Sequence, residues 1–182
     1  MLITSSCSQG FQYKYDKKPA QVNCPGANTK LLNEALYSFF DDITAYYISN
    51  SNDPSMQGIS TYEAYANYAY SGALGTADFG SIASEHTIKV MNELKKETQL
   101  WDKKPAMSNL NYDSELVGCL IENIKNKDMK TSIQSLHAAN SLTPKLMAER
   151  FRMQIKDALD DPNYGMYIAL DTYYQYVYDL KL

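Results

Sequence analysis

The sequence predicts an all-α fold, a single antiparallel bundle of about six to seven helices. Apolar residues recur at intervals of three and four positions in several separate segments. No segment alternates polar and apolar residues as a half-buried strand does, and no Asn-Gly hairpin turn or fixed-length repeat occurs. The 182-residue chain is 45% hydrophobic and 21% charged, which is typical of a globular domain with a real core.

The segment 28–49 carries the clearest helical pattern, and we expect the rest of the chain to be organised around it. Asn28 or Thr29 can serve as the N-cap, since either side chain can accept a hydrogen bond from a free amide of the first turn. Its apolar stripe is best interpreted as core, with a ligand or partner groove as the alternative. The stripe contains Leu32, Leu36, Phe39, Ile43 and Tyr46.

Two more helices are expected before the middle of the chain. Residues 50–58 are rich in turn-forming residues, and Ser60 with Glu63 then matches a capping box that opens a helix to about Ser71. The next helix is expected from about Asp78 to Glu97. Its inner face should carry Phe79, Ala83, His86, Val90 and Leu94.

The second half predicts four shorter helices. Asp113 and Asp128 can each cap one of them, while the dipeptides Thr143-Pro144 and Asp161-Pro162 begin the other two, because proline is favoured at the first helical position. The last helix has the same four-three-four-three spacing as the first, so we expect the two to pack together. Its stripe contains Met166, Leu170, Tyr173, Val177 and Leu180.

The N-terminus contains a short functional signal. Thr4, Ser5 and Ser6 are small or polar residues that precede Cys7, with Ile3 one position further out. This stretch resembles the end of a bacterial lipoprotein signal peptide, in which the cysteine is lipidated and becomes the first residue. The resemblance departs from the pattern at Thr4, where an aliphatic residue is usual, and the basic segment and most of the apolar segment are missing.

The resemblance divides the chain into two regions. Residues 1–27 would comprise a truncated signal and an irregular tether, or a segment laid on the domain, and residues 28–182 would form the helical domain. It places the protein in the bacterial cell envelope, membrane-anchored and facing the periplasm or the surface, with a cytoplasmic location as the alternative. If Cys7 carries lipid, Cys24 and Cys119 remain as a pair that an oxidising compartment can join in a disulfide. The alternative for Cys119 is a buried small apolar side chain.

Familiar catalytic and metal-binding patterns are absent, so no catalytic, cofactor or metal residues are predicted. Neither His86 nor His137 has a Cys, His or carboxylate three or four residues away, which a local helical metal site needs. A core role is favoured for His86, while assembly of Glu85, His86 and His137 across helices stays open. The pair Asp41-Asp42 is expected at a solvated or inter-helix position, and Asp160-Asp161 at a helix cap.

These observations favour a non-enzymatic, lipid-tethered envelope protein with a binding or structural role. Sixteen tyrosines suit contacts with a protein or glycan partner. The net charge of −4 gives no general attraction for nucleic acid or for an anionic membrane, so membrane contact is expected only through the lipid. One alternative is a small acidic inhibitor or immunity-type protein, and another is an enzyme with a dispersed site around His86.

Overall fold

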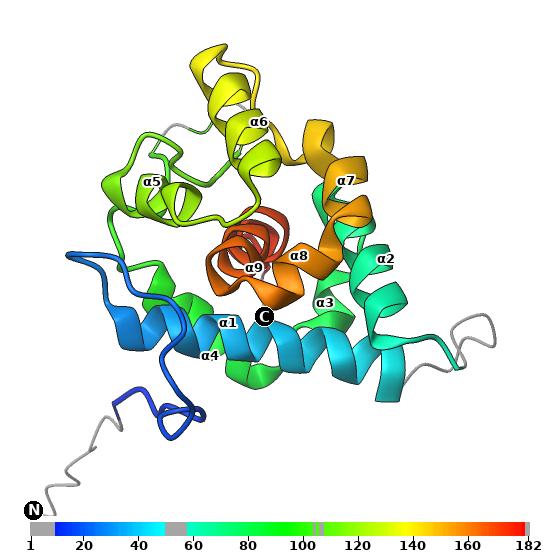
Figure 1. The fold of residues 1–182 in the computed structure, drawn as a ribbon. Coiled ribbons are helices and arrows are strands. Elements are labelled where there is room, and N and C mark those ends of the chain that lie inside the picture. The colour runs from blue at the N-terminus through cyan, green and yellow to red at the C-terminus, as the bar shows by residue number, and fades with distance from the viewer. Residues whose placement is uncertain (1–9, 50–57, 104, 106–107, 181–182) are drawn as a thin grey trace, which may run out of the picture.

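The computed structural model describes residues 10–49, 58–103, 105 and 108–180, and this part of the chain is all-α (Figure 1). An isolated antiparallel bridge between Trp101 and Leu110 is its only extended pairing. The helices are α1 (Thr29–Thr44), the π-helical turn η1 (Ala45–Ser49), α2 (Thr61–Ala73), α3 (Phe79–Ile82), α4 (Glu85–Leu94), α5 (Glu115–Glu122), α6 (Lys127–Ala138), α7 (Pro144–Met153), α8 (Ile155–Asp160), α9 (Pro162–Ala169), the π-helical turn η3 (Leu170–Tyr174) and α10 (Gln175–Val177).

The C-terminal helix, rather than the first one, lies at the centre of the molecule. Helices α9, η3 and α10 follow one another without a break, and in Figure 1 the other helices surround them. The closing helix does pack on α1, as its stripe predicted, but it also contacts α2, α5 and α8. Tyr164, Tyr167, Tyr173 and Tyr174 are all fully buried. The predicted stripe therefore described only one face of this helix, whose residues 164–175 are buried on every side.

Helix α1 begins at the predicted cap and ends differently from the prediction. The Asn28 side chain accepts a hydrogen bond from the Leu31 amide at 3.1 Å. The helix then widens into η1, whose i to i+5 hydrogen bonds rotate the following residues relative to an α-helix. As a result Tyr47 is buried and Tyr46 only half-buried, which corrects the last position of the predicted stripe.

Two helices expected to be continuous are broken. Ala83 adopts an extended conformation, and Ser84 then caps α4 by accepting from the Thr87 amide, so the helix expected over residues 78–97 is divided into α3 and α4. The spacing of Met147, Phe151, Ile155 and Leu159 predicts one helix from Thr143-Pro144, but Gln154 leaves the helical region at φ −110° and ψ 22° and separates α7 from α8. In each case a local side-chain or backbone preference interrupts an apolar spacing that continues across the break.

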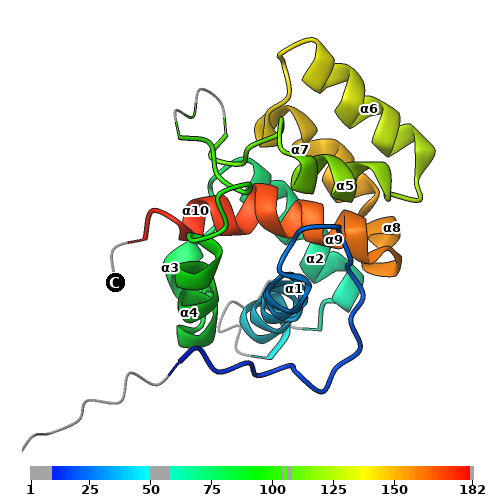
Figure 2. The same ribbon diagram turned by 90° about the vertical axis from the view of Figure 1, so that its left-hand side faces the viewer.

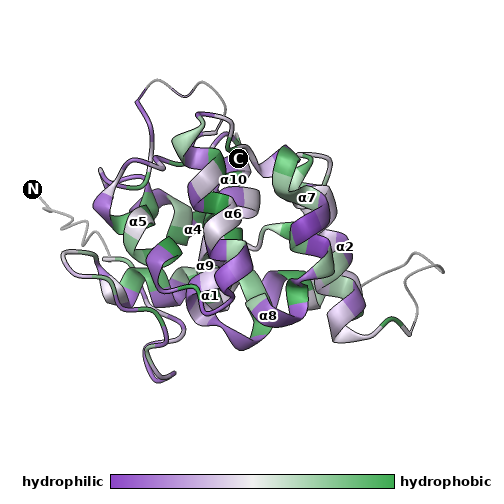
Figure 3. Cartoon of the chain, turned by 45° about the horizontal axis from the view of Figure 1, so that its top comes forward, coloured by the Kyte–Doolittle hydropathy of each residue, from purple (hydrophilic) through white to green (hydrophobic). Residues whose placement is uncertain are grey.

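The predicted caps are correct in four cases, including Asn28, and displaced in two. The capping box of Ser60 and Glu63 is present in both directions, and Thr143 and Asp161 cap α7 and α9. Helices α5 and α6 are capped by Ser114 and Asn126, which lie next to or near the predicted aspartates. Amphipathic character is visible on the peripheral helices α2 and α7, which carry both hydrophilic and hydrophobic residues (Figure 3). No described helix is both long and apolar enough to cross a membrane.

Residues 10–27, here called the strap, run along the helices without regular structure (Figure 2). Asn33 of α1 holds the strap, because its Oδ1 accepts from the amides of Gln21 (2.6 Å) and Val22 (3.0 Å) and its Nδ2 donates to the Val22 carbonyl at 2.8 Å. Val22 and Cys24 are buried in the core. The described strap is therefore an integral layer of the domain and not a free tether.

Candidate functional site

A polar hollow between the strap and α4 contains a histidine. It has a volume of about 550 Å³ and is lined by Gly10 to Lys14 on one side and by His86, Lys89, Asn92 and Glu93 on the other. A volume of this size suits a small ligand or a short segment of a larger one. We call this hollow the strap cleft.

His86 is held in the strap cleft by a buried carboxylate. Its Nε2 lies 2.7 Å from Oε1 of Glu34, whose side chain is 1% exposed, while the imidazole is 18% exposed. Glu34 also accepts hydrogen bonds from the backbone amides of Lys14 and Tyr15. A carboxylate can only accept hydrogen bonds, so the Nε2 atom that faces Glu34 must carry the proton of this contact. In a neutral His86 ring, Nδ1 is then the acceptor.

Aromatic rings pack against this histidine on two sides. Phe11 stacks on the His86 ring with centroids 6.0 Å apart, and Tyr15 meets it edge-on at 5.8 Å. The Tyr15 hydroxyl donates to Oδ2 of Asp41 at 2.6 Å. Burial, aided by the Asp41 carboxylate, raises the pKa of Tyr15. This phenol therefore stays neutral near pH 7 and serves as a hydrogen-bond donor that fixes the strap to α1.

The strap cleft is lined by aromatic, amide and charged side chains. None of the described residues that line it is Ser, Thr or Cys. Phe11 and Tyr13 offer aromatic rings, Lys89 offers a charge, and the amides Gln12 and Asn92 can both donate and accept hydrogen bonds. These groups can contact a polar ligand with a flat face, and His86 and Glu93 are among the lining side chains of types that act in proton transfer.

His137 lies elsewhere, so the open assembly of Glu85, His86 and His137 does not form. Its Nε2 is 2.9 Å from Oδ1 of Asp113, and both side chains are exposed. This pair borders a separate hollow of about 240 Å³ that also includes Ser108 and Tyr112. Both histidines thus have a carboxylate partner that helical spacing could not reveal, since Glu34 and Asp113 are 52 and 24 residues away in the sequence.

A buried carboxyl lies beneath the smaller hollow. Oδ1 of Asp171 accepts from the hydroxyls of Tyr112 at 2.7 Å and Ser108 at 3.3 Å. Burial is the main cause that raises the pKa of Asp171 to about 7, and the hydrogen bonds only partly oppose it. Tyr167 is near enough to influence this carboxyl, yet its hydroxyl and Oδ2 of Asp171 make no well-formed hydrogen bond with a described residue.

The two aspartate pairs have structural roles. Asp41 binds the strap, whereas Asp42 is buried and its Oδ2 accepts from Thr87 (2.5 Å), Tyr173 (2.7 Å) and the Ser84 amide (3.2 Å). Asp42 therefore joins α1, α4 and η3, the inter-helix position that was one of the expectations. Asp161 caps α9, as expected, and its Oδ2 also accepts from the amide of Lys125 at 2.7 Å.

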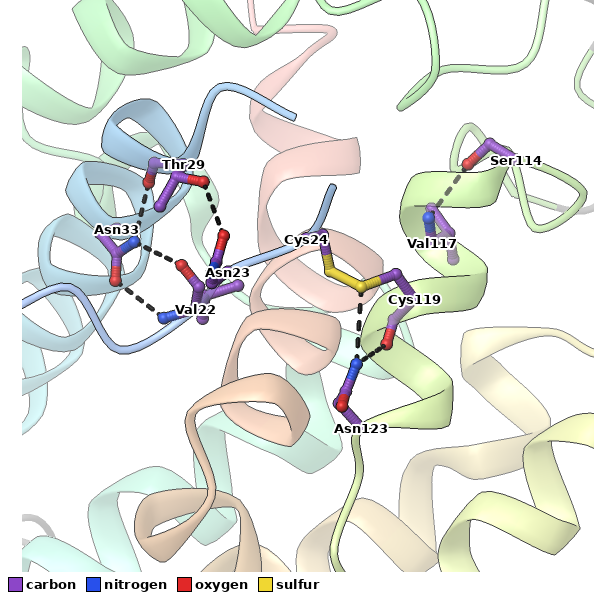
Figure 4. Close-up of a disulfide and its surroundings, with 9 residues drawn as sticks. All are labelled: Val22, Asn23, Cys24, Thr29, Asn33, Ser114, Val117, Cys119 and Asn123. Carbon is purple, nitrogen blue, oxygen red and sulfur yellow. Dashed lines mark hydrogen bonds between the residues drawn. A yellow bond between two sulfur atoms is a disulfide. The ribbon is translucent and has the colours of Figure 1, made fainter. Parts of the chain in front are cut away.

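Cys24 and Cys119, the pair that the sequence left open, are joined by a disulfide in the structure (Figure 4). Their Cα atoms are 5.9 Å apart, and 95 positions separate them in the sequence. The bond ties the strap to α5, and Nδ2 of Asn123 donates to the Cys119 carbonyl at 2.8 Å. Cys7, the predicted lipidation site, lies outside the described residues.

Among the described residues, no three His, Cys, Asp or Glu side chains converge as they would around a metal ion. No protein-family model, curated protein or solved structure matches this chain.

Proposed function

We propose that this protein is a non-enzymatic, lipid-tethered component of the bacterial cell envelope that binds a protein or glycan partner. The disulfide between Cys24 and Cys119 is the observation that carries the location, because such bonds persist in oxidising compartments and are rare in the cytosol. The tether rests on the lipoprotein-like residues Ile3 to Cys7. Both features concern the same end of the chain, since the strap that follows Cys7 is the segment fixed by the disulfide.

The strap cleft supports the binding role. Its rings and amides are the groups that contact sugar faces and hydroxyls or the backbone of a peptide. Glu34 holds His86 and the strap backbone in place before any ligand arrives, and a preorganised site loses less free energy on binding. The disulfide fixes the far end of the strap in the same way.

Metabolic labelling tests the tether. The full-length gene, with whatever codons precede Met1, is expressed in a bacterial host supplied with labelled palmitate. We expect the label in the wild-type protein and none in the Cys7→Ala variant, because the thiol of that residue is the acceptor. Cys119→Ala is the control, and it should keep the label. Absence of label from the wild type would reject the tether.

Nuclear magnetic resonance tests the binding role. Isotope-labelled protein is titrated with oligosaccharides and with short peptides of the envelope, and signals from Phe11, His86 and Asn92 are followed. Removal of an aromatic contact in Phe11→Ala should weaken binding by about tenfold, or ~1.4 kcal/mol. Lys127→Ala, on the distant helix α6, should not alter it. Shifts at the His137 hollow alone would contradict this choice of site.

A second function, an enzyme with a site around His86, is favoured by one specific observation. The ring is fixed by a buried carboxylate at the edge of a polar hollow, the arrangement that orients a general base. A dry, apolar environment for both histidines would have argued against this alternative, and neither has one. The described lining contains no Ser, Thr or Cys, so such a base would act on water, on the ligand itself or on a lysine of the lining.

Recovery of the ligand separates the two functions. A ligand identified in the titration is incubated with the protein for hours and analysed by mass spectrometry. The binding role predicts that the wild type returns the ligand unchanged. Conversion by the wild type, with loss of conversion in His86→Gln but not in His137→Gln, would instead establish the enzyme.

A further inference from the structure

Positive charge is concentrated ahead of α1, although the whole chain is acidic. Residues 1–30 contain four lysines and a single acidic residue, Asp16, and their formal charge is +3. Because the chain as a whole carries −4, residues 31–182 carry −7. The net charge of the whole chain conceals this asymmetry. For that reason the net charge alone gave no ground to expect attraction to an anionic surface.

The four lysines are exposed and cluster on the strap and the first turn of α1. They are Lys14, Lys17, Lys18 and Lys30. Three of them lie over tyrosine rings. The Nζ atom of Lys30 is 4.1 Å from the ring centre of Tyr13, that of Lys18 is 4.6 Å from that of Tyr37, and that of Lys14 is 4.9 Å from that of Tyr15. We call these four lysines, together with Phe11 and Tyr13, the basic face.

Neighbouring carboxylates neutralise only part of this charge. Asp41 forms an ion pair with Lys14 at 3.2 Å. Glu34 is buried and already bound to His86 and to two strap amides, so it presents no charge at the surface. Three lysines and the exposed Asp16 are then left, so this surface keeps a net positive charge. The ammonium groups of Lys14, Lys18 and Lys30 lie over tyrosine ring faces as cation–π contacts, and tyrosine is a residue type enriched where a membrane meets water.

The proposed tether would hold this face close to a membrane. Gly10, where the described strap begins, is three positions after Cys7, so the chain between them can span at most ~11 Å. That distance is similar to the screening length of roughly 8–10 Å at physiological salt, within which lysines are attracted to anionic lipid. A single acyl chain binds membranes weakly and gains from a second, basic signal.

We propose that the basic face rests on anionic phospholipid headgroups of the membrane that carries the tether. The strap cleft then lies at the membrane surface, with the acidic remainder of the domain turned away from it. This inference rests on the proposed tether, but it can be tested without lipidation, because the lysines attract the headgroups whether or not Cys7 is modified.

Vesicle sedimentation provides the test. The full chain with Cys7→Ser is mixed with vesicles of phosphatidylcholine alone or with about 30% phosphatidylglycerol, at low and at physiological salt. One variant replaces the basic face by Lys14→Gln, Lys17→Gln, Lys18→Gln and Lys30→Gln. A matched control makes the same change in net charge at exposed lysines elsewhere, by Lys96→Gln, Lys127→Gln, Lys145→Gln and Lys156→Gln.

We expect partition into the anionic vesicles that falls with salt and is negligible for neutral ones. The basic-face variant should lose roughly fivefold for each lysine removed, and the control much less. Equal partition into both kinds of vesicle, no partition into either, or an equal loss in the control would overturn the inference. Circular dichroism checks that both variants are folded.

Amine footprinting provides a second measurement that does not need strong binding. The wild-type chain is attached through Cys7 to maleimide lipids, since the other two cysteines are bonded to each other, and is acetylated briefly. On anionic vesicles the lysines of the basic face should be labelled less than Lys127 and Lys145. Equal labelling would overturn the inference, whereas failure of the palmitate experiment would reject the natural tether and leave this result standing.

Discussion

The buried carboxyl of Asp171 makes the stability of this protein depend on pH in an unusual direction. A carboxyl with a higher pKa in the folded state binds its proton more tightly there, so it stabilises the folded state only while it is protonated. This stabilisation is fully present below about pH 3.8, the ordinary pKa of an aspartate, and it is lost as the pH rises through about 7, the pKa of Asp171 in the folded state. Replacement by asparagine should remove this loss while keeping an oxygen for Tyr112 and Ser108.

The magnitude follows from the two pKa values. The difference between 3.8 and about 7 corresponds to roughly 4 kcal/mol, which applies without a discount for solvent because the Asp171 side chain is fully buried. Asp171→Asn should therefore leave the free energy of unfolding nearly unchanged at pH 4 and raise it at pH 8 by up to that amount. Intermediate values are expected between pH 4 and 7.

Urea denaturation at a series of pH values measures the effect, and the difference between variant and wild type cancels the titration of other groups. Asp42→Asn is the matched control, a second buried aspartate whose Oδ2 accepts three hydrogen bonds. Loss of its charge should lower stability at pH 8 by roughly 1–3 kcal/mol. A difference for Asp171→Asn that does not change with pH, or destabilisation at pH 8, would refute the reasoning.

Three further predictions concern the scaffold, each measured by chemical denaturation. The double variant Cys24→Ala and Cys119→Ala should lose about 4–5 kcal/mol of unfolding free energy, the loop-closure value for a sequence separation of 95, and reductant should have the same effect on the wild type but none on the variant. Gly72→Ala should lower the free energy of unfolding by roughly 1–3 kcal/mol, because the new Cβ would lie 2.9 Å from the buried Tyr68 ring. An unchanged denaturation midpoint would contradict this packing. Ser60→Ala should lower the free energy of unfolding by about 1 kcal/mol, because the helix cap is lost. An unchanged free energy of unfolding would argue against the capping box.

Helix positions and most faces could be read from local spacing. The stripe of α1 through Ile43, the capping box at Ser60 and the starts at Thr143 and Asp161 follow from interactions within a few residues, which the sequence displays directly. The breaks at Ala83 and Gln154 could not be read in this way, because the apolar spacing continues through them.

The strap cleft could not be predicted, because its parts come from three distant segments. His86 was expected to be a satisfied core histidine, and it is satisfied, but by Glu34 on another helix and at the edge of a hollow. Only the packing of the strap over α1 and α4 creates that hollow. Residue spacing along one helix carries no information about such contacts.

The sequence by itself determined the all-α class, the main helix starts and the pair of cysteines available for bridging. Tertiary structure alone decided which helix is central, which carboxylate meets which histidine, and which rings the lysines of the strap lie over. The physical reason is the distance along the sequence over which each interaction acts. Caps and apolar stripes arise from neighbours within one or two turns, whereas burial, charge pairing and pKa depend on segments that the chain brings together from far apart.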